Sequence, residues 1–113
     1  MARNTFILNE ELLATTALTA DIEGDAVGID GRPNLGVMVT WSSLTGTLDA
    51  EYSLEVSNDG TDWSSLTTPV SVSGASDSDA VISQEAFFTY VRLKVTQNNV
   101  TGGNISATIS FFQ

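Results

Sequence analysis

Apolar and polar residues alternate along most of this chain with a period of two, the pattern of a β-strand with one buried face. In the clearest segment, Tyr52, Leu54 and Val56 alternate with Ser53 and Glu55. The same alternation recurs at 12–22, 37–41, 91–95 and 105–111. No segment shows a convincing 3.6-residue period, so the pattern predicts an all-β protein.

Turn-forming residues separate the alternating segments. Asp30–Asn34 reads as a loop, and Asn58-Asp59-Gly60 predicts a tight turn because glycine, asparagine and aspartate tolerate a positive φ. Ser42–Asp49 is a predicted hairpin connection, and Gln97–Gly103 is a predicted turn region. About eight short strands at this spacing predict an antiparallel β-sandwich, jelly-roll-like in character. The lack of helical segments between them argues against a parallel sheet.

The chain length of 113 residues predicts one domain, assigned to residues 12–113. Residues 1–11 are predicted to form an extended N-terminal arm, in which Phe6, Ile7 and Leu8 lie between polar flanks. Such an apolar trio at a chain end suggests that something ties it down. The trio is too short for the apolar region of a signal peptide, and no apolar stretch of the chain is long enough to span a membrane. No membrane partner is therefore expected.

The composition excludes several classes of function. The chain has no cysteine and no histidine, so disulfides and the commonest metal ligands and general bases are absent. Its net charge of −10 argues against direct binding of nucleic acid. Glu51 and Glu55 share a strand face that we expect to be exposed, and no nucleophile motif is present. We therefore predict no catalytic residues, no cofactor and no enzyme activity.

The segment Asn58–Asp62 has the residue types of a calcium loop without the EF-hand spacing. A hairpin turn explains all five residues, so we predict no metal site, with a weak calcium site as the open alternative.

The aromatic residues divide into two groups. Trp41 and Trp63 each follow an alternating apolar pattern and are predicted to lie in the core. Tyr90, Phe112 and one of the Phe87–Phe88 pair are surplus to the core faces, and exposed aromatic residues tend to mark interfaces. Arg92 and Lys94 share a face with Tyr90, which predicts a locally basic face on an acidic protein.

Three segments together resemble small virion structural proteins of tailed bacteriophages: L-E-V-S-N-D-G-T-D-W, Y-V-R-L-K-V-T and N-I-S-A-T-I-S-F. The resemblance covers roughly residues 35–112. Several proteins of that kind are head decoration (cement) proteins. The resemblance implies a β-sandwich that is made in the host cytoplasm and binds the major capsid protein on the outer capsid surface. It also implies a homo-oligomer, with a trimer favoured.

On this hypothesis the partner interface is assigned to seven residues: Arg3, Phe6, Ile7, Leu8, Tyr90, Arg92 and Phe112. Two alternatives stay open. S-N-D-G-x-x-W also occurs in discoidin-like and other carbohydrate-binding sandwiches, so the chain could be a sugar-binding module that uses Trp63 and the 58–62 loop. It could also be a tail or neck component.

Overall fold

The protein is an antiparallel β-sandwich, here described from a computed structural model. The structure describes residues 8–29, 31–72 and 77–112, with side chains for all of these except 8, 9, 47–49, 77–84 and 112. Two long strands dominate, β4 (Asn34–Ser57) and β8 (Tyr90–Phe112). The other strands are β1 (Leu8–Ala17), β2 (Ile22–Glu23), β3 (Val27–Gly28), β5 (Ser64–Ser65), β6 (Val70–Ser71) and β7 (Asp77–Glu85). None of the described residues forms a helix long and apolar enough to cross a membrane.

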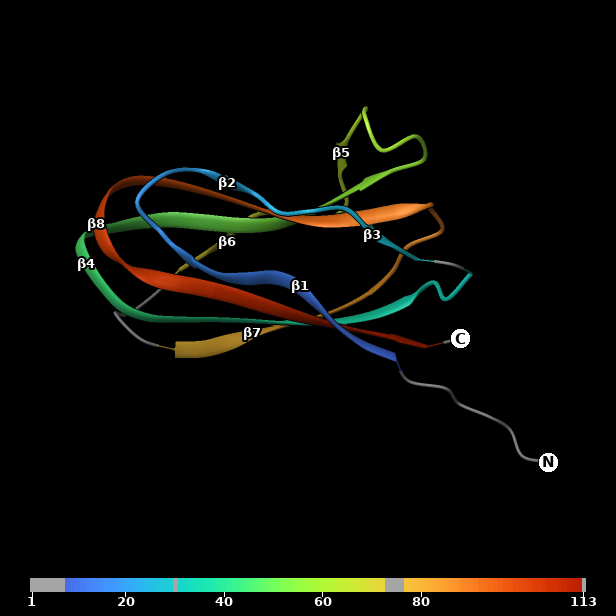
Figure 1. Ribbon diagram of the computed structural model, residues 1–113, viewed down its shortest axis with the longest axis horizontal. Helices are drawn as coiled ribbons and strands as arrows, with labels where there is room; N and C mark the ends of the chain where they lie inside the picture. The colour runs from blue at the N-terminus through green and yellow to red at the C-terminus, as the bar shows by residue number, and fades with distance from the viewer. Residues whose placement is uncertain (1–7, 30, 73–76, 113) are drawn as a thin grey trace.

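The two layers of the sandwich are made by one two-stranded ribbon that bends back over itself. β4 and β8 pair antiparallel along their whole length, from Asn34–Phe112 to Ser57–Tyr90. Both strands curve round at the end of the molecule opposite the termini (Figure 1). In the first layer, residues 34–42 and 104–112 are flanked by β7 and β1. In the second, residues 50–57 and 90–98 are flanked by β5 and β6 on one side and by β2 and β3 on the other.

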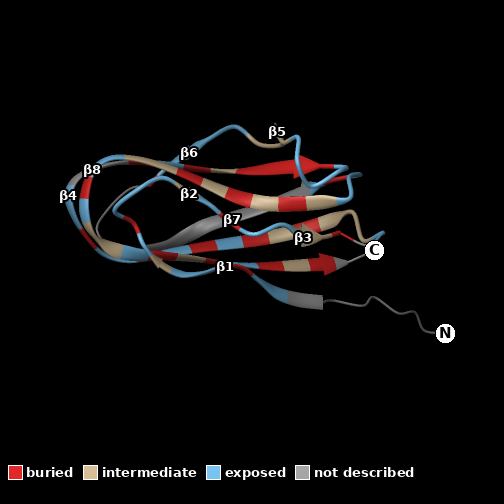
Figure 2. Ribbon diagram, turned by 45° about the horizontal axis from the view of Figure 1, so that its top comes forward, coloured by how far each residue is buried: buried red, intermediate tan, exposed pale blue. Residues whose placement is uncertain are grey.

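The core lies between the two layers. Inward residues alternate with outward ones along both long strands, so buried and exposed positions appear as stripes (Figure 2). The residues predicted to face inward on 37–41, 52–56, 91–95 and 105–111 are all buried. Trp41 from the first layer and Tyr52 from the second meet in this core, with ring centroids 6.0 Å apart. The predicted fold class and the core position of Trp41 are therefore confirmed.

The prediction of a hairpin at 42–49 is wrong, because β4 continues through this segment as a bend. β8 likewise continues through 97–103. The bend lies between two paired positions, Ser42 with Asn104 and Ala50 with Gln97. Between them, β4 contains one residue more than β8. That extra residue changes the inward positions of β4 from odd-numbered to even-numbered, while those of β8 stay odd.

The N-terminal prediction needs two corrections. β1 starts at Leu8, which pairs with Phe111, so residues 8–11 belong to the sheet although the predicted arm included them. The regular alternation predicted from Leu12 to Ile22 is also wrong in part. Register shifts on either side of Leu13 place both Leu12 and Leu13 in the core.

Candidate interaction surface

A pair of exposed phenylalanines lies at the end of the sandwich opposite the bend. Phe87 is 74% exposed and Phe88 is 41% exposed, in the short connection between β7 and β8. Large apolar side chains this accessible, at two successive positions of the chain, are a typical feature of binding surfaces.

The backbone around the two rings is held on both sides. The Ala86 amide donates to the Pro33 carbonyl at 2.7 Å, and the Ile29 amide donates to the Thr89 carbonyl at 2.9 Å. The amide and hydroxyl of Thr89 both donate to Oδ1 of Asn58. A backbone segment held in this way loses little conformational freedom on binding, which favours affinity.

The neighbouring 57–62 turn closes on its own hydrogen bonds. Ser57 Oγ accepts from the amides of Asp59 and Gly60 and donates to Asp59 Oδ1. The same Oδ1 accepts from the amides of Thr61 and Asp62, both at 2.8 Å. β5 then returns alongside β4, so the predicted hairpin turn is confirmed. Among the residues that the structure describes, no three acidic side chains come together as a metal site would require.

These bonds make the turn sensitive to acid. The amides of Asp62 and Thr61, and then the Ser57 hydroxyl, lower the pKa of Asp59 from 3.8 to about 2. Because the folded-state pKa is depressed, the stabilisation is fully present above pH 3.8 and is lost as the pH falls through about 2. We expect Asp59→Asn to lose this part of the acid dependence, since the amide oxygen still accepts but does not titrate in that range. Urea denaturation of both proteins across this range measures it, and parallel stability–pH curves would contradict it.

A shallow depression of about 240 Å³ joins the turn to Phe88. Its lining residues are Val56, Ser57, Asn58, Asp59, Asp62, Ser64 and Phe88. Tyr90 is half-buried beside it, with its ring close to Gly60. We call Phe87, Phe88, Tyr90 and the 57–62 turn the aromatic end.

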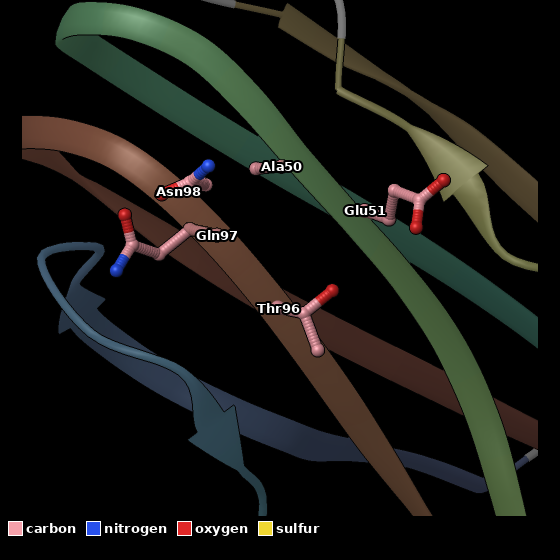
Figure 3. A pocket seen from close by; sticks show the side chains of 5 residues that line it. All are labelled: Ala50, Glu51, Thr96, Gln97 and Asn98. Carbon is pink, nitrogen blue, oxygen red and sulfur yellow. The ribbon is translucent and has the colours of Figure 1, made fainter.

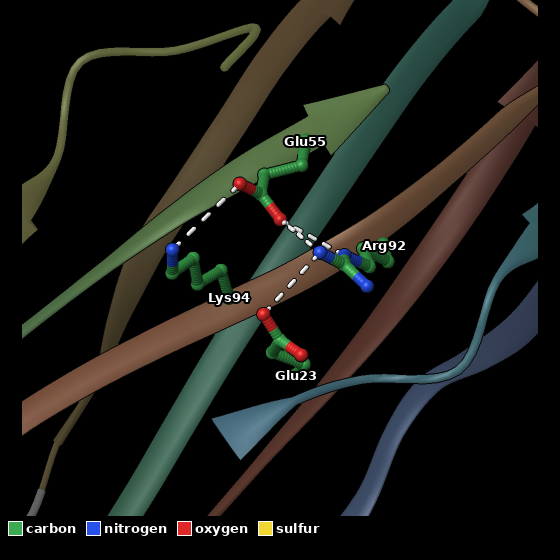
Figure 4. Close-up of polar contacts among 4 residues, drawn as sticks. All are labelled: Glu23, Glu55, Arg92 and Lys94. Carbon is green, nitrogen blue, oxygen red and sulfur yellow. Dashed lines mark hydrogen bonds and ion pairs between the residues drawn. The ribbon is translucent and has the colours of Figure 1, made fainter. Parts of the chain in front are cut away.

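The outward face of the second layer carries an ion-pair network (Figure 4). Arg92 Nε donates to Glu55 Oε1 at 2.9 Å, and Arg92 also reaches Glu23 Oε2 at 3.4 Å. Lys94 Nζ lies 3.9 Å from Glu55 Oε2. Trp63 packs on the Arg92 guanidinium, whose carbon lies 4.2 Å from the ring centroid.

This network overturns three sequence-based predictions. Trp63 is half-buried on the outside of the sheet and not in the core. Glu55 is buried, at 8% exposure, and not solvated. The face around Arg92 and Lys94 is not a free basic patch, because both cations are paired with carboxylates.

Another depression, of about 220 Å³, lies near the bend (Figure 3). It is lined by Ala50, Glu51, Thr96, Gln97 and Asn98, of which only Glu51 is ionisable. Gln97 already makes two hydrogen bonds within the fold: its backbone amide donates to Asp21 Oδ1, and its side-chain oxygen accepts from the backbone amide of Val100. These five residues supply no acid–base pair.

The structure brings only part of the predicted interface together. Arg3, Phe6 and Ile7 lie outside the described residues. Leu8 and Phe112 both lie in the first layer, at the ends of β1 and β8. Tyr90 belongs to the aromatic end, and Arg92 is engaged within the second layer. Their roles in binding stay predictions. Phe87 and Phe88 were missing from the predicted site, although two adjacent phenylalanines cannot both face the core of an alternating strand.

Comparison with known proteins gives the fold a context. No protein-family model matches the sequence, and no curated protein matches it either. Among solved structures, the chain resembles the SPBc2 prophage-derived protein YomS, with a TM-score of 0.68 and 15% identity. That alignment covers 100% of this chain and 98% of the other. The fold is shared with a prophage-derived protein.

A second likeness is to a chain from the structure of infectious bursal disease virus, Gx strain. The TM-score is 0.57 and the identity 11%, over 97% of this chain and 32% of the viral one. The chain thus spans about a third of that viral chain. At these identities the two likenesses establish the fold.

Proposed function

We propose that this chain is a structural protein of a bacteriophage virion, and that it acts as a decoration (cement) protein bound to the outside of the head. The observation that carries the proposal is the end-to-end fold likeness to a prophage-derived protein of nearly the same length. The likeness to a viral chain points the same way.

The surface chemistry supports binding without catalysis. The aromatic end supplies accessible rings on a hydrogen-bonded backbone segment, which suit a contact with another protein. The net charge of −10 suits a position away from packaged DNA. A protein that binds only the assembled shell stabilises that shell by mass action, with no chemical step.

The sugar-binding alternative loses support from the position of Trp63. A sugar platform needs a free ring face, and one face of the Trp63 ring is already covered by Arg92. The 58–62 loop is also occupied by its own hydrogen bonds.

Binding to isolated phage particles tests the proposal. We expect the purified chain to co-sediment with expanded heads that lack it, and to raise the temperature at which those heads release DNA. Binding to tails alone would replace the cement role with that of a tail component. Binding to neither would refute a virion role.

The aromatic end gives the binding test a specific variant. We expect Phe87→Ser combined with Phe88→Ser to weaken head binding by about 30-fold or more, as loss of an interface hot spot worth about 2 kcal/mol would. Val70→Ser is the matched control, because Val70 is 42% exposed and lies elsewhere, on β6. Thermal melting of each variant checks its fold. Equal weakening by both changes would show that the aromatic end is not the contact.

A further inference from the structure

Among the residues whose side chains the structure describes, those that face outward on the two central strands of the first layer, β4 and β8, carry no ionisable group. They are Asn34, Gly36, Met38, Thr40, Ser42, Asn104, Ser106, Thr108 and Ser110. We call these nine residues the charge-free face. The nearest described acids are at its edges, with Glu11 of β1 opposite Thr108 and Glu85 of β7 opposite Asn34. The outward face of the second layer, by contrast, carries Glu51, Glu55, Arg92 and Lys94.

The centre of the charge-free face has a projection beside a hollow. Met38 is 47% exposed and is the one large apolar side chain among these nine residues. Gly36 lies two residues away on the same face, where a Cβ would meet nothing within 4 Å. A depression of about 220 Å³ is lined by Gly36, Val37, Met38, Thr108 and Ser110.

We propose that the chain self-associates through the charge-free face, with Met38 of each copy seated against the Gly36 depression of the other. A two-fold axis that passes between Met38 and Gly36 places the Met38 side chain of each copy over the Gly36 depression of the other. Such a self-complementary contact is what an isologous interface requires. The partner is therefore a second copy of this chain, and the assembly is a dimer; the resemblance had favoured a trimer.

Charge and hydrogen bonding favour the same partner. Two chains that each carry −10 repel one another, and carboxylates buried face to face would leave acceptors without donors. Hydroxyl groups both donate and accept, so the serine and threonine side chains of this face can pair with their own copies. The face offers a basic partner no carboxylate and an acidic partner no cation. The depletion of charge and the exposed methionine are two features that this face shares with interface cores.

Sedimentation equilibrium over a wide range of concentration tests this proposal independently of any phage particle. We expect the wild-type chain to dimerise, and Met38→Glu and Gly36→Val each to raise the dissociation constant about 10-fold or more. Gly36→Val places a good strand former at an open position, so its effect reports on the interface and not on folding. Ser53→Glu, on the outward face of the other layer, adds the same charge and should leave the dissociation constant unchanged.

Salt provides a second readout. An interface without charge between two acidic chains should tighten as salt screens their overall repulsion, whereas one built on Arg92 or Lys94 should weaken. A wild-type chain that is monomeric at every concentration would overturn the proposal. So would dimers that Met38→Glu and Gly36→Val leave intact, or dimers that dissociate as salt is raised.

Discussion

Replacing Gly46 or Gly103 by alanine is expected to destabilise the protein by about 3–5 kcal/mol, because each change combines backbone strain with a collision inside the bend. Gly46 has a φ of 90°, and a Cβ there would collide with the carbonyl oxygen of Asn99 on the paired strand. Gly103 has a φ of 101°, and its Cβ would lie 2.7 Å from both the Cα of Leu44 and the carbonyl oxygen of Ser43. Backbone atoms of a paired strand cannot move aside cheaply.

Gly31→Ala is the matched control for this prediction. Gly31 also has a positive φ, 75°, but a Cβ there meets nothing within 4 Å. It should cost about 1 kcal/mol, the strain term alone. Equilibrium unfolding in urea measures all three variants. Costs at Gly46 and Gly103 no larger than at Gly31 would mean that the bend is not sterically closed.

Replacing Arg92 by alanine is the second large effect, with an expected loss of about 3 kcal/mol. The change leaves the buried carboxylate of Glu55 without its closest cation, since Arg92 Nη2 lies 2.8 Å from Glu55 Oε1. Lys94 compensates only in part, because it is 3.9 Å away and 39% exposed. The change also uncovers the Trp63 ring that packs on the guanidinium. Urea unfolding measures the loss, and the fluorescence of Trp63 should shift as its ring becomes wetter.

Two further variants separate the ion pair from general damage to the sheet. Lys94→Ala removes a looser contact and should cost less than about 1 kcal/mol. The double change Glu55→Leu with Arg92→Met removes both charges together and should lie within about 1 kcal/mol of the wild type. If the double variant proved as unstable as Arg92→Ala, the cost would come from lost packing and not from an unpaired charge.

The alternation of side chains was enough to predict which faces of the long strands are buried. Tyr52, Leu54 and Val56 point inward as expected, and so do Val91, Leu93 and Val95. The connections were harder to predict, because a hairpin and a bent strand use the same local residues. Gly46 and Asn99 satisfy a positive φ in either case, and only the pairing of β4 with β8 on both sides of the bend decides between them.

The surface was less predictable than the core. Glu55 looks solvated from its own strand, and its burial depends on Arg92, which is 37 residues away and is brought opposite by the register. Trp63 follows a turn whose return strand, β5, is only two residues long. Such a short strand has too little alternation to predict which face of the sheet Trp63 lies on. Phe87 and Phe88 carried a usable signal in their adjacency, but their backbone anchors to Pro33, Ile29 and Asn58 involve distant segments.

The folded ribbon also has a consequence for how the chain reaches its native state. Since β4 and β8 run through both layers, we expect the two layers to unfold together in one cooperative transition. β4 and β8 are separated in the sequence by β5, β6 and β7. Bringing them together therefore costs chain entropy before their pairing contributes any stabilisation. Such a topology places the chain among slow folders, on a timescale of roughly milliseconds to seconds. While the ribbon is unpaired, its apolar strands are open to other copies, and the high negative charge of the chain then keeps nascent molecules apart.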